Sequence, residues 1–523
     1  MNKNFKEKKG REQMQKGITL VALVITIVII IILATVSINA VFGDSGLIKK
    51  AQKAKEMTAN SIIKEQEEMN KLLEEYDKII DEDSNIPEPE IPYIDSELAV
   101  APRLSDGMIP VKWNGTKWVK TTKEDKEWYD YANKEWANIV LGDATFITSG
   151  SEEILDESKA YSMLVWIPRY AYQITSGYHQ NSSTAGNINV VFIDTNNQNK
   201  DKSKIYSENY PDYATGSGMT DYVVHPAFNY GGKKLAGIWV GKYETSNTDC
   251  TTSSGTGRYN GTDKTVTIKA GVTSWRSITV SNIFTVCTNI NNAGNPYGLN
   301  TSDSVVDPHM MKNTEWGAVA YLSKSKYGKE TEEVWINPNS NCITGQAGNS
   351  VSASSTTTTN AYNTTNGQKA STTGNVTGVY DMSGGAVEYV AAYLNNGNTN
   401  LNTYGSNLVG ADVRYKDVYS VGSSDTRENN YALSTPVNGK YGDAVYETSS
   451  SSDSPYTNSW YSDFSYFPNS SVPFFKRGGD CSNASDAGVF SFDYDNGDYN
   501  GVYSFRLVLP VMWYLKSEQN LLM

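Results

Sequence analysis

This chain of 523 residues has few histidines and cysteines and no surplus of basic residues. It has three histidines and four cysteines, at His179, His225, His309, Cys250, Cys287, Cys342 and Cys481. The cysteines are too few for a disulfide scaffold and do not have the spacing of a zinc site, and the histidines form no pattern typical of an iron centre. Lys+Arg 45 against Asp+Glu 58 gives a net charge of −13, so nucleic acid is not an expected partner.

Long apolar runs are also missing, with one exception near the start. Residues 18–41 are 24 residues without a charge, about 36 Å as a helix, which covers a hydrocarbon core of ~30 Å. Residues 1–17 carry six basic and two acidic side chains, a net +4 that keeps the N-terminus in the cytoplasm. We therefore expect a basic leader (1–17), a transmembrane helix (18–42) and a single-pass membrane protein with an extracellular C-terminal domain.

A charged segment follows the apolar one. Within residues 43–83, apolar side chains recur at helical spacing, which predicts an amphipathic stalk helix; they are Ile62, Met69, Leu73, Tyr76 and Ile80. Three prolines then fall within residues 84–97, which predicts an extended linker, because proline lacks the N–H that a helix needs.

The residues at the start of the apolar run carry a resemblance. The sequence Lys16-Gly17-Ile18-Thr19-Leu20-Val21 resembles the signal of type IV prepilins. That resemblance implies cleavage after Gly17 by a prepilin peptidase, an N-methylated Ile18, and partnership with the membrane and with other pilin-like subunits. The family usually has glutamate at the fifth mature position, whereas this chain has Ala22, which puts filament assembly in question.

Beyond residue 98 the sequence changes to short β-type runs separated by Asn, Gly, Ser and Thr. Apolar runs bounded by Gly or Pro predict strands at 109–113, 164–168, 189–193 and 237–241. Helical spacing predicts a helix over 312–326, and the Ser/Thr-rich stretch 345–378 reads as a surface loop. We divide this part into a small β-rich extension (98–159) and a larger domain (160–515).

Four segments of the larger domain, in order, resemble the formylglycine-generating-enzyme-like domain. They are 241–246 (GKYETS), 312–316 (KNTEW), 379–389 (VYDMSGGAVEY), and 477–479 (RGG) followed by 504–509 (SFRLVL). The resemblance implies a C-type lectin fold. The expected fold class is therefore α+β: a long N-terminal transmembrane and stalk helix, then a mixed α/β C-type-lectin-like domain with much irregular structure. Trp239, Trp316 and Tyr389 are expected to pack in its core and Arg506 to be buried and hydrogen-bonded.

Catalysis is not expected from these residues. Oxidase members of the family have two cysteines after the Arg-Gly-Gly motif, and here only Cys481 follows Gly479. Relatives hold a structural calcium near the segment that contains Glu388, although Gly385 and Val387 replace two of the family's residues there. We expect no cofactor other than this calcium, with Glu388 as its candidate ligand.

The stretch 480–503, called the tract below, is the candidate binding surface. It contains no Lys, Arg, Glu or Gln and is rich in Tyr, Ser, Asp, Asn and Gly, the composition of antibody paratopes. It also resembles the variable region of receptors diversified by diversity-generating retroelements. Residues 487–490, Phe492 and Phe505 would be its framework. The candidate ligand-binding residues are Asp480, Cys481, Ser482, Asn483, Ser485, Asp486, Ser491, Asp493, Tyr494, Asn496, Asp498, Tyr499, Asn500, Val502 and Tyr503.

Three functions remain open on the sequence. The first is a surface-displayed, pilin-like adhesin or receptor that binds an external protein or cell-surface ligand through the tract. The second is a minor pilin or pseudopilin of a type IV pilus or a secretion system, with a structural head. The third is a surface enzyme. Cysteine pairing also stays open, since four cysteines allow three pairings.

Overall fold

The structure of the protein is a computed structural model. It describes residues 25, 97, 99–142, 153–181, 183–211, 213–214, 218–292, 295–299, 304–356 and 358–513. The chain divides into two units, Met1–Glu90 and Ile91–Met523, and all described residues except Ile25 belong to the second. The leader, the stalk, the linker except Glu97, and the predicted transmembrane segment except Ile25 therefore lie outside the described residues.

The central element is an antiparallel sheet of seven strands. Its order is β16 (His309–Met310), β24 (Leu507–Leu509), β12 (Gly237–Gly241), β4 (Ser162–Pro168), β3 (Asn138–Leu141), β1 (Met108–Trp113) and β2 (Trp118–Lys120). β3, β4 and β12 are buried along their whole length, as expected for continuous apolar runs covered on both faces. Trp166 on β4 faces Trp239 on β12, with ring centroids 5.1 Å apart.

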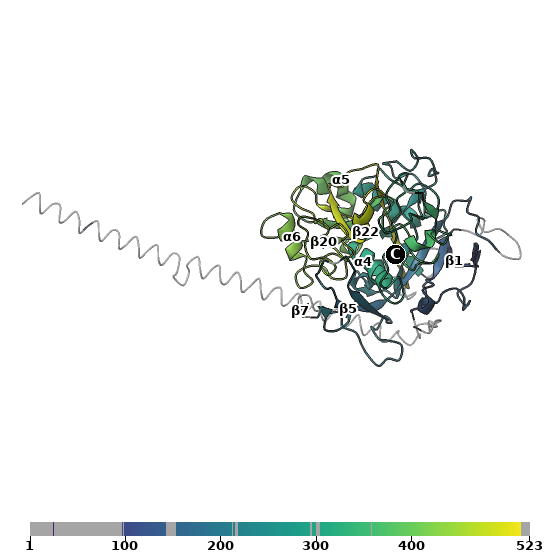
Figure 1. The fold of residues 1–523 in the computed structure, drawn as a ribbon, viewed down its shortest axis with the longest axis horizontal. Helices are drawn as coiled ribbons and strands as arrows, with labels where there is room; N and C mark the ends of the chain where they lie inside the picture. Colours follow the sequence, from purple (N-terminus) through teal and green to yellow (C-terminus); the bar gives the residue numbers. More distant parts are fainter. Residues whose placement is uncertain are drawn as a thin grey trace, which may run out of the picture. The chain divides into compact units, whose positions relative to one another are not determined.

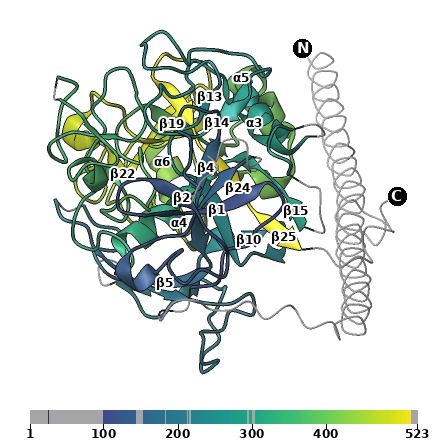
Figure 2. The ribbon, with the colours of Figure 1, turned by 90° about the vertical axis from the view of Figure 1, so that its right-hand side faces the viewer.

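This sheet joins distant parts of the sequence. β1, β2 and β3 come from the residues expected to form the 98–159 extension, while the other four strands come from the residues expected to form the 160–515 domain. Figure 2 shows β1, β2, β4 and β24 together near the middle of the described domain. The core is accordingly continuous across the two segments.

A second sheet carries the tract. It contains β20 (Asp417–Tyr419), β19 (Val387–Leu394), β21 (Phe474–Gly478) and β22 (Gly488–Asp495), and β23 (Tyr503–Phe505) pairs with β19. β19 runs parallel to β20 and β23 and antiparallel to β21. In Figure 1, β22 lies next to β20, below α5 (Thr399–Gly410) and to the right of α6 (Arg427–Leu433).

Shorter elements complete the described domain. The remaining strands form a three-stranded sheet and five pairs: β6 (Asn187–Phe192), β5 (Tyr170–Ser176) and β9 (Val223–Val224); β7 (Tyr213–Ala214) with β8 (Gly218–Met219); β10 (Asn229–Tyr230) with β11 (Lys233–Lys234); β13 (Ser246–Asn247) with β14 (Val266–Thr267); β15 (Ser304–Val306) with β25 (Val511–Trp513); and β17 (Gln346–Ala347) with β18 (Asn360–Ala361). The α-helices are α3 (Val280–Thr288), α4 (Asn313–Lys324), α5 (Thr399–Gly410) and α6 (Arg427–Leu433).

The predicted helix over 312–326 is confirmed as α4, and every residue of α4 is buried. The Glu315 carboxylate accepts a hydrogen bond from the Lys312 backbone N–H, which satisfies one donor at the start of the helix. Trp316 donates its indole N–H to the Val489 carbonyl at 2.8 Å, so α4 supports β22, the strand inside the tract.

The predicted fold class is wrong in its long N-terminal helix. Within the described part of the chain, no helix has the length and apolar character needed to span a membrane. The longest described helices, α4 and α5, have 12 residues each, about 18 Å, which is short of a ~30 Å hydrocarbon core. The same finding contradicts the predicted single-pass membrane location. The described fold is strand-rich with short helices.

Candidate functional site

The tract runs from the end of β21 through a 3-10 turn (Ala484–Asp486) and β22 into β23. Gly478 and Gly479, which immediately precede it, have φ of 85° and 69°, values that favour glycine. A Cβ on Gly479 would lie 2.8 Å from Ala487, so this turn also needs glycine for space. The turn directs the chain away from β21 and back along β22.

The expected framework residues are all buried. Ala487, Phe490, Phe492 and Phe505 have no exposed surface, and Val489 has 4%. Gly488 approaches the Asp463 carboxylate so closely that a Cβ would lie 2.0 Å from Asp463 Oδ2. Phe490 packs edge-on against Trp460, with centroids 5.1 Å apart. The base of the tract is therefore fixed by close packing.

Most of the candidate ligand-binding residues lie at the surface. The exposed ones are Ser482, Asn483, Ser485, Tyr499 and Asn500, and the partly exposed ones are Asp480, Asp486, Asp493, Tyr494, Asn496, Asp498, Val502 and Tyr503. Cys481 and Ser491 are buried, so they do not offer contact area to a ligand. That the surface residues bind a ligand stays a prediction.

A buried lysine holds part of this surface in place. Lys476 Nζ lies 3.1 Å from Asp493 Oδ2 and 3.2 Å from Asp495 Oδ2, and the Tyr503 hydroxyl donates to Asp495 Oδ2 at 2.7 Å. Burial alone would lower the pKa of Lys476, but the neighbouring carboxylates raise it above its usual range. Asp493 and Tyr503 are thus committed to this ion-pair network.

Tyr494 belongs to a half-buried aromatic group. Its ring lies 4.4 Å from that of Tyr466, which lies 4.4 Å from that of Tyr456. The Arg427 guanidinium of α6 sits 3.8 Å from the Tyr466 ring and 4.8 Å from the Tyr456 ring. Tyr494 is therefore held by its ring contact with Tyr466, which Arg427 in turn holds through a cation–π contact.

Two cysteines meet at the start of the tract. All four cysteines are free and buried, and the thiols of Cys342 and Cys481 hydrogen-bond each other. This hydrogen bond raises the pKa of Cys342 and lowers that of Cys481. Arg276 donates to Cys342 Sγ at 3.4 Å and to the Gly501 carbonyl at 2.9 Å, which links both ends of the tract. The pairing of Cys342 with Cys481 was not predicted, because no spacing pattern in the sequence marks the two cysteines as neighbours.

Glu388 lies inside the domain beside Arg506. The Arg506 guanidinium donates to both carboxylate oxygens of Glu388, at 2.5 and 3.1 Å. Burial raises the pKa of Glu388 to about 7, although Arg506 acts in the opposite direction. Within the described residues, no group of three His, Cys, Asp or Glu side chains is arranged to hold a metal ion. Calcium at Glu388 stays a prediction, and the bidentate ion pair occupies the oxygens that it would use.

The histidines are packed against aromatic or acidic partners. His179 stacks on Tyr446 with centroids 3.8 Å apart. Burial lowers the pKa of His225 to about 3. His309 Nε2 lies 2.9 Å from Glu315 Oε1.

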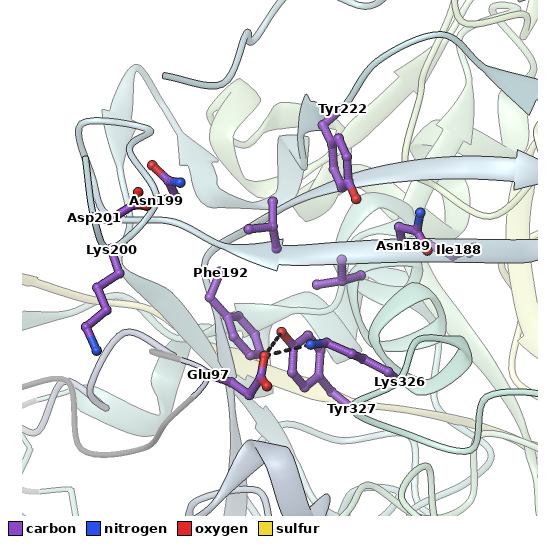
Figure 3. A pocket seen from close by; sticks show the side chains of 12 residues that line it. Glu97, Ile188, Asn189, Phe192, Asn199, Lys200, Asp201, Tyr222, Lys326 and Tyr327 are labelled. Carbon is purple, nitrogen blue, oxygen red and sulfur yellow. Dashed lines mark hydrogen bonds and ion pairs between the residues drawn. The ribbon is translucent and has the colours of Figure 1, made fainter. Parts of the chain in front are cut away.

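A hollow of about 650 Å³ opens beside β6 (Figure 3), and none of the histidines lines it. Phe192, Tyr222 and Tyr327 line it together with charged side chains. Glu97 Oε2 accepts hydrogen bonds from Lys326 Nζ at 2.7 Å and from the Tyr327 hydroxyl at 2.9 Å, as Figure 3 shows. No residue of the tract lines this hollow, so it is separate from the candidate binding surface.

Comparison with known proteins shows no family for this chain. The described domain is a strand-rich domain with a surface tract on a rigid base. No family model matches the chain, and no curated protein matches it. Among solved structures it is similar to Treponema denticola variable protein 1, at 12% identity and a TM-score of 0.23, over 66% of this chain and 95% of that chain. So weak a likeness carries no argument about fold or function.

Proposed function

We propose that this protein binds a ligand through the surface of the tract and acts by binding, not by catalysis. One observation carries the proposal: the tract places its framework side chains in the core and most of its Tyr, Ser, Asp and Asn side chains at the surface. A surface built on a packed base tolerates substitution without loss of the fold, which is what a recognition site requires.

Tyr499 is the expected anchor of the interface. Its side chain is 57% exposed at the turn between β22 and β23. Tyrosine provides a large contact area at low entropic cost, and neighbouring Asn, Ser and Asp groups supply hydrogen bonds. Asp493 and Tyr503 are held by Lys476, and Tyr494 by Tyr466, so these residues contribute a fixed shape.

The test uses the full chain, fluorescently labelled, on an array of purified extracellular proteins and glycans. We expect the unmodified chain to bind at least one spot and Tyr499→Ala to weaken that binding about tenfold or more, because large aromatic anchors carry much of the binding energy. Val437→Ala is the control, since Val437 is 79% exposed and lies outside the tract. Equal binding by all three proteins would contradict the proposal.

Diversification of the tract is a finer part of the same proposal. It rests on the residue types at the surface positions and on their resemblance to variable regions. The similar solved structure is named a variable protein, which agrees with the proposal without supporting it. DNA sequencing around the gene tests this part directly: a template repeat and a reverse transcriptase are expected, and their absence would remove diversification while leaving ligand binding open.

Processing at the N-terminus is a separate proposal, carried by the motif Lys16-Gly17-Ile18. A prepilin peptidase would cut after Gly17, and pilin-like subunits would be partners. Mass spectrometry of the purified protein should find Ile18 as the first residue, whereas a protein that begins at Met1 would contradict this. The alternative function, a minor pilin or pseudopilin, predicts that Gly17 variants impair assembly and that tract variants do not.

A further inference from the structure

Cys342 and Cys481 lie side by side although they are far apart in the sequence. Their thiols hydrogen-bond each other, so the two sulfur atoms are within bonding reach of one another after a small movement. Cys342 has no exposed surface, whereas Cys481 is 6% exposed and stands in the first turn of the tract. The structure therefore joins a cysteine of the core to a cysteine at the edge of the surface.

Hydrogen bonds of neighbouring residues hold the two cysteines together independently of their thiols. The Cys481 N–H donates to the Gly385 carbonyl at 2.9 Å, and the Gly385 N–H donates to the Asn337 carbonyl at 2.7 Å. The side-chain amide of Asn337 donates to the carbonyl of Ile343, the residue after Cys342, at 2.8 Å. These buried groups are satisfied only by one another, so they fix the approach of the two chain segments.

The two thiols differ in reactivity. Their hydrogen bond lowers the pKa of Cys481 and raises that of Cys342, so Cys481 is the sulfur that loses its proton more readily. Cys481 also adjoins Ser482, which is exposed. The Arg276 guanidinium lies 3.4 Å from Cys342 Sγ, where its charge stabilises a thiolate. Cys481 is thus suited to react first and Cys342 second.

We propose that Cys342 and Cys481 form a disulfide by exchange with a small disulfide oxidant, R–S–S–R. In the first step the Cys481 thiolate attacks one sulfur of the oxidant, which forms a mixed disulfide and expels one R–S⁻. In the second step the Cys342 thiolate attacks Cys481 Sγ, which forms the protein disulfide and expels the second R–S⁻. The two cysteine protons pass to the two leaving thiolates. The cysteines are thereby oxidised, and the oxidant is reduced to two R–SH.

Cys250 and Cys287 are less suited to such a bond. Cys250 Sγ accepts a hydrogen bond from the Asn247 N–H at 3.2 Å, and Cys287 lies on α3 with no exposed surface. Burial raises the pKa of both thiols, which makes each a poor nucleophile. All four cysteines belong to the described residues, and the pair with a thiol–thiol hydrogen bond is Cys342 and Cys481.

The cross-link would attach the start of the tract to a segment outside it. It would close a loop of about 140 residues in the unfolded chain, and constraining so long a loop lowers the entropy of the unfolded state. We therefore expect the oxidised chain to melt at a higher temperature than the reduced chain. The disulfide forms without a ligand, so its failure and the failure of the proposed binding function are distinguishable.

The experiment incubates the full chain with oxidised glutathione in native buffer. Remaining thiols are then blocked with iodoacetamide in denaturant, and the unreduced peptides are mapped by mass spectrometry. We expect a cross-linked pair of peptides that contains Cys342 and Cys481 and disappears on reduction. Cys250 and Cys287 should be alkylated. Four alkylated cysteines, a different pairing, or glutathione that remains on Cys481 would overturn the proposal.

Single variants then test the order of the two steps. Cys342→Ser should stop after the first step and keep one glutathione on Cys481. Cys481→Ser should leave Cys342 unmodified and abolish the rise in Tm on oxidation. Cys250→Ser is the matched control and should form the cross-link as the unmodified chain does.

Glutathione on Cys342 in the Cys481→Ser variant, or none on Cys481 in the Cys342→Ser variant, would overturn this order. Circular dichroism checks that each variant folds. If one does not, the peptide map and the melting temperatures of the unmodified chain, oxidised and reduced, decide whether the disulfide forms.

Discussion

Buried charged residues in this protein are held by specific partners. Arg506 donates to the Gly241 and Tyr380 carbonyls as well as to Glu388, and Arg477 donates to the carbonyls of Asp443 and Ala444. Such pairing is what makes a buried guanidinium tolerable, since removing one partner would leave the other uncompensated in the core. The motif arginines thus have structural roles, which confirms the expectation that Arg506 is buried and hydrogen-bonded.

Asp443 makes stability depend on pH. It has no exposed surface and accepts a hydrogen bond from the Tyr419 hydroxyl at 2.6 Å, and burial raises its pKa to about 7. In the unfolded chain its pKa is about 3.9. The folded-state pKa is the higher one, so the stabilising contribution of Asp443 is complete below about pH 4 and is lost as the pH rises through about 7.

We therefore expect Asp443→Asn to flatten the pH dependence of the unfolding free energy between about pH 4 and pH 7, since the amide does not titrate. Denaturant unfolding at several pH values measures this. Asp201→Asn is the control: Asp201 is at the surface, and the Ser203 hydrogen bond lowers its pKa, so its substitution should act only below this pH range. Parallel profiles for Asp443→Asn and the unmodified chain would contradict the assignment.

At the scale of elements, apolar runs with clear boundaries were predictable. The run 237–241 is β12, and helical spacing placed α4 within a residue or two of its ends. Trp239, Trp316 and Tyr389 are buried as expected. In these cases a local pattern is enough, because each segment is enclosed by the core on all sides.

Other elements depend on partners that sequence spacing does not reveal. The stretch 345–378 was predicted to be a surface loop, yet Ser371 and Thr372 have no exposed surface. The Lys242 ammonium, itself fully buried, donates to the Val376 and Gly378 carbonyls at 2.6 and 2.8 Å, which satisfies polar groups that would otherwise require water. The Cys342–Cys481 contact in the candidate site was missed for the same reason.

Close packing at the start of β22 gives a prediction for this element. Gly488→Ala would force its new methyl group against Asp463, whose Oδ2 accepts a hydrogen bond from the Phe490 N–H at 3.0 Å. We expect a loss of about 1–3 kcal/mol and a Tm lower by several degrees in a thermal melt. Gly255→Ala is the control, since nothing lies within 4 Å of its Cβ position. Equal melting of both variants would contradict this account.

At the scale of the whole molecule, the seven-stranded sheet makes residues 98–159 part of the main core. β3 lies between β1 and β4, and β4 is buried throughout. Deleting residues 98–159 should expose the edge of β4, so we expect aggregation and loss of cooperative unfolding. Solubility and calorimetry against the full chain measure this. A deletion variant that melts cooperatively at the original temperature would show that the two segments fold separately.

The place of β24 in this sheet sets when the protein can fold. β24 comes from residues 507–509 but sits between β16 and β12, so during synthesis β12 has an open edge until residues 507–509 have been made. At ~5–20 residues per second, that interval lasts on the order of tens of seconds. The growing chain must therefore be kept from aggregating until β24 has been made.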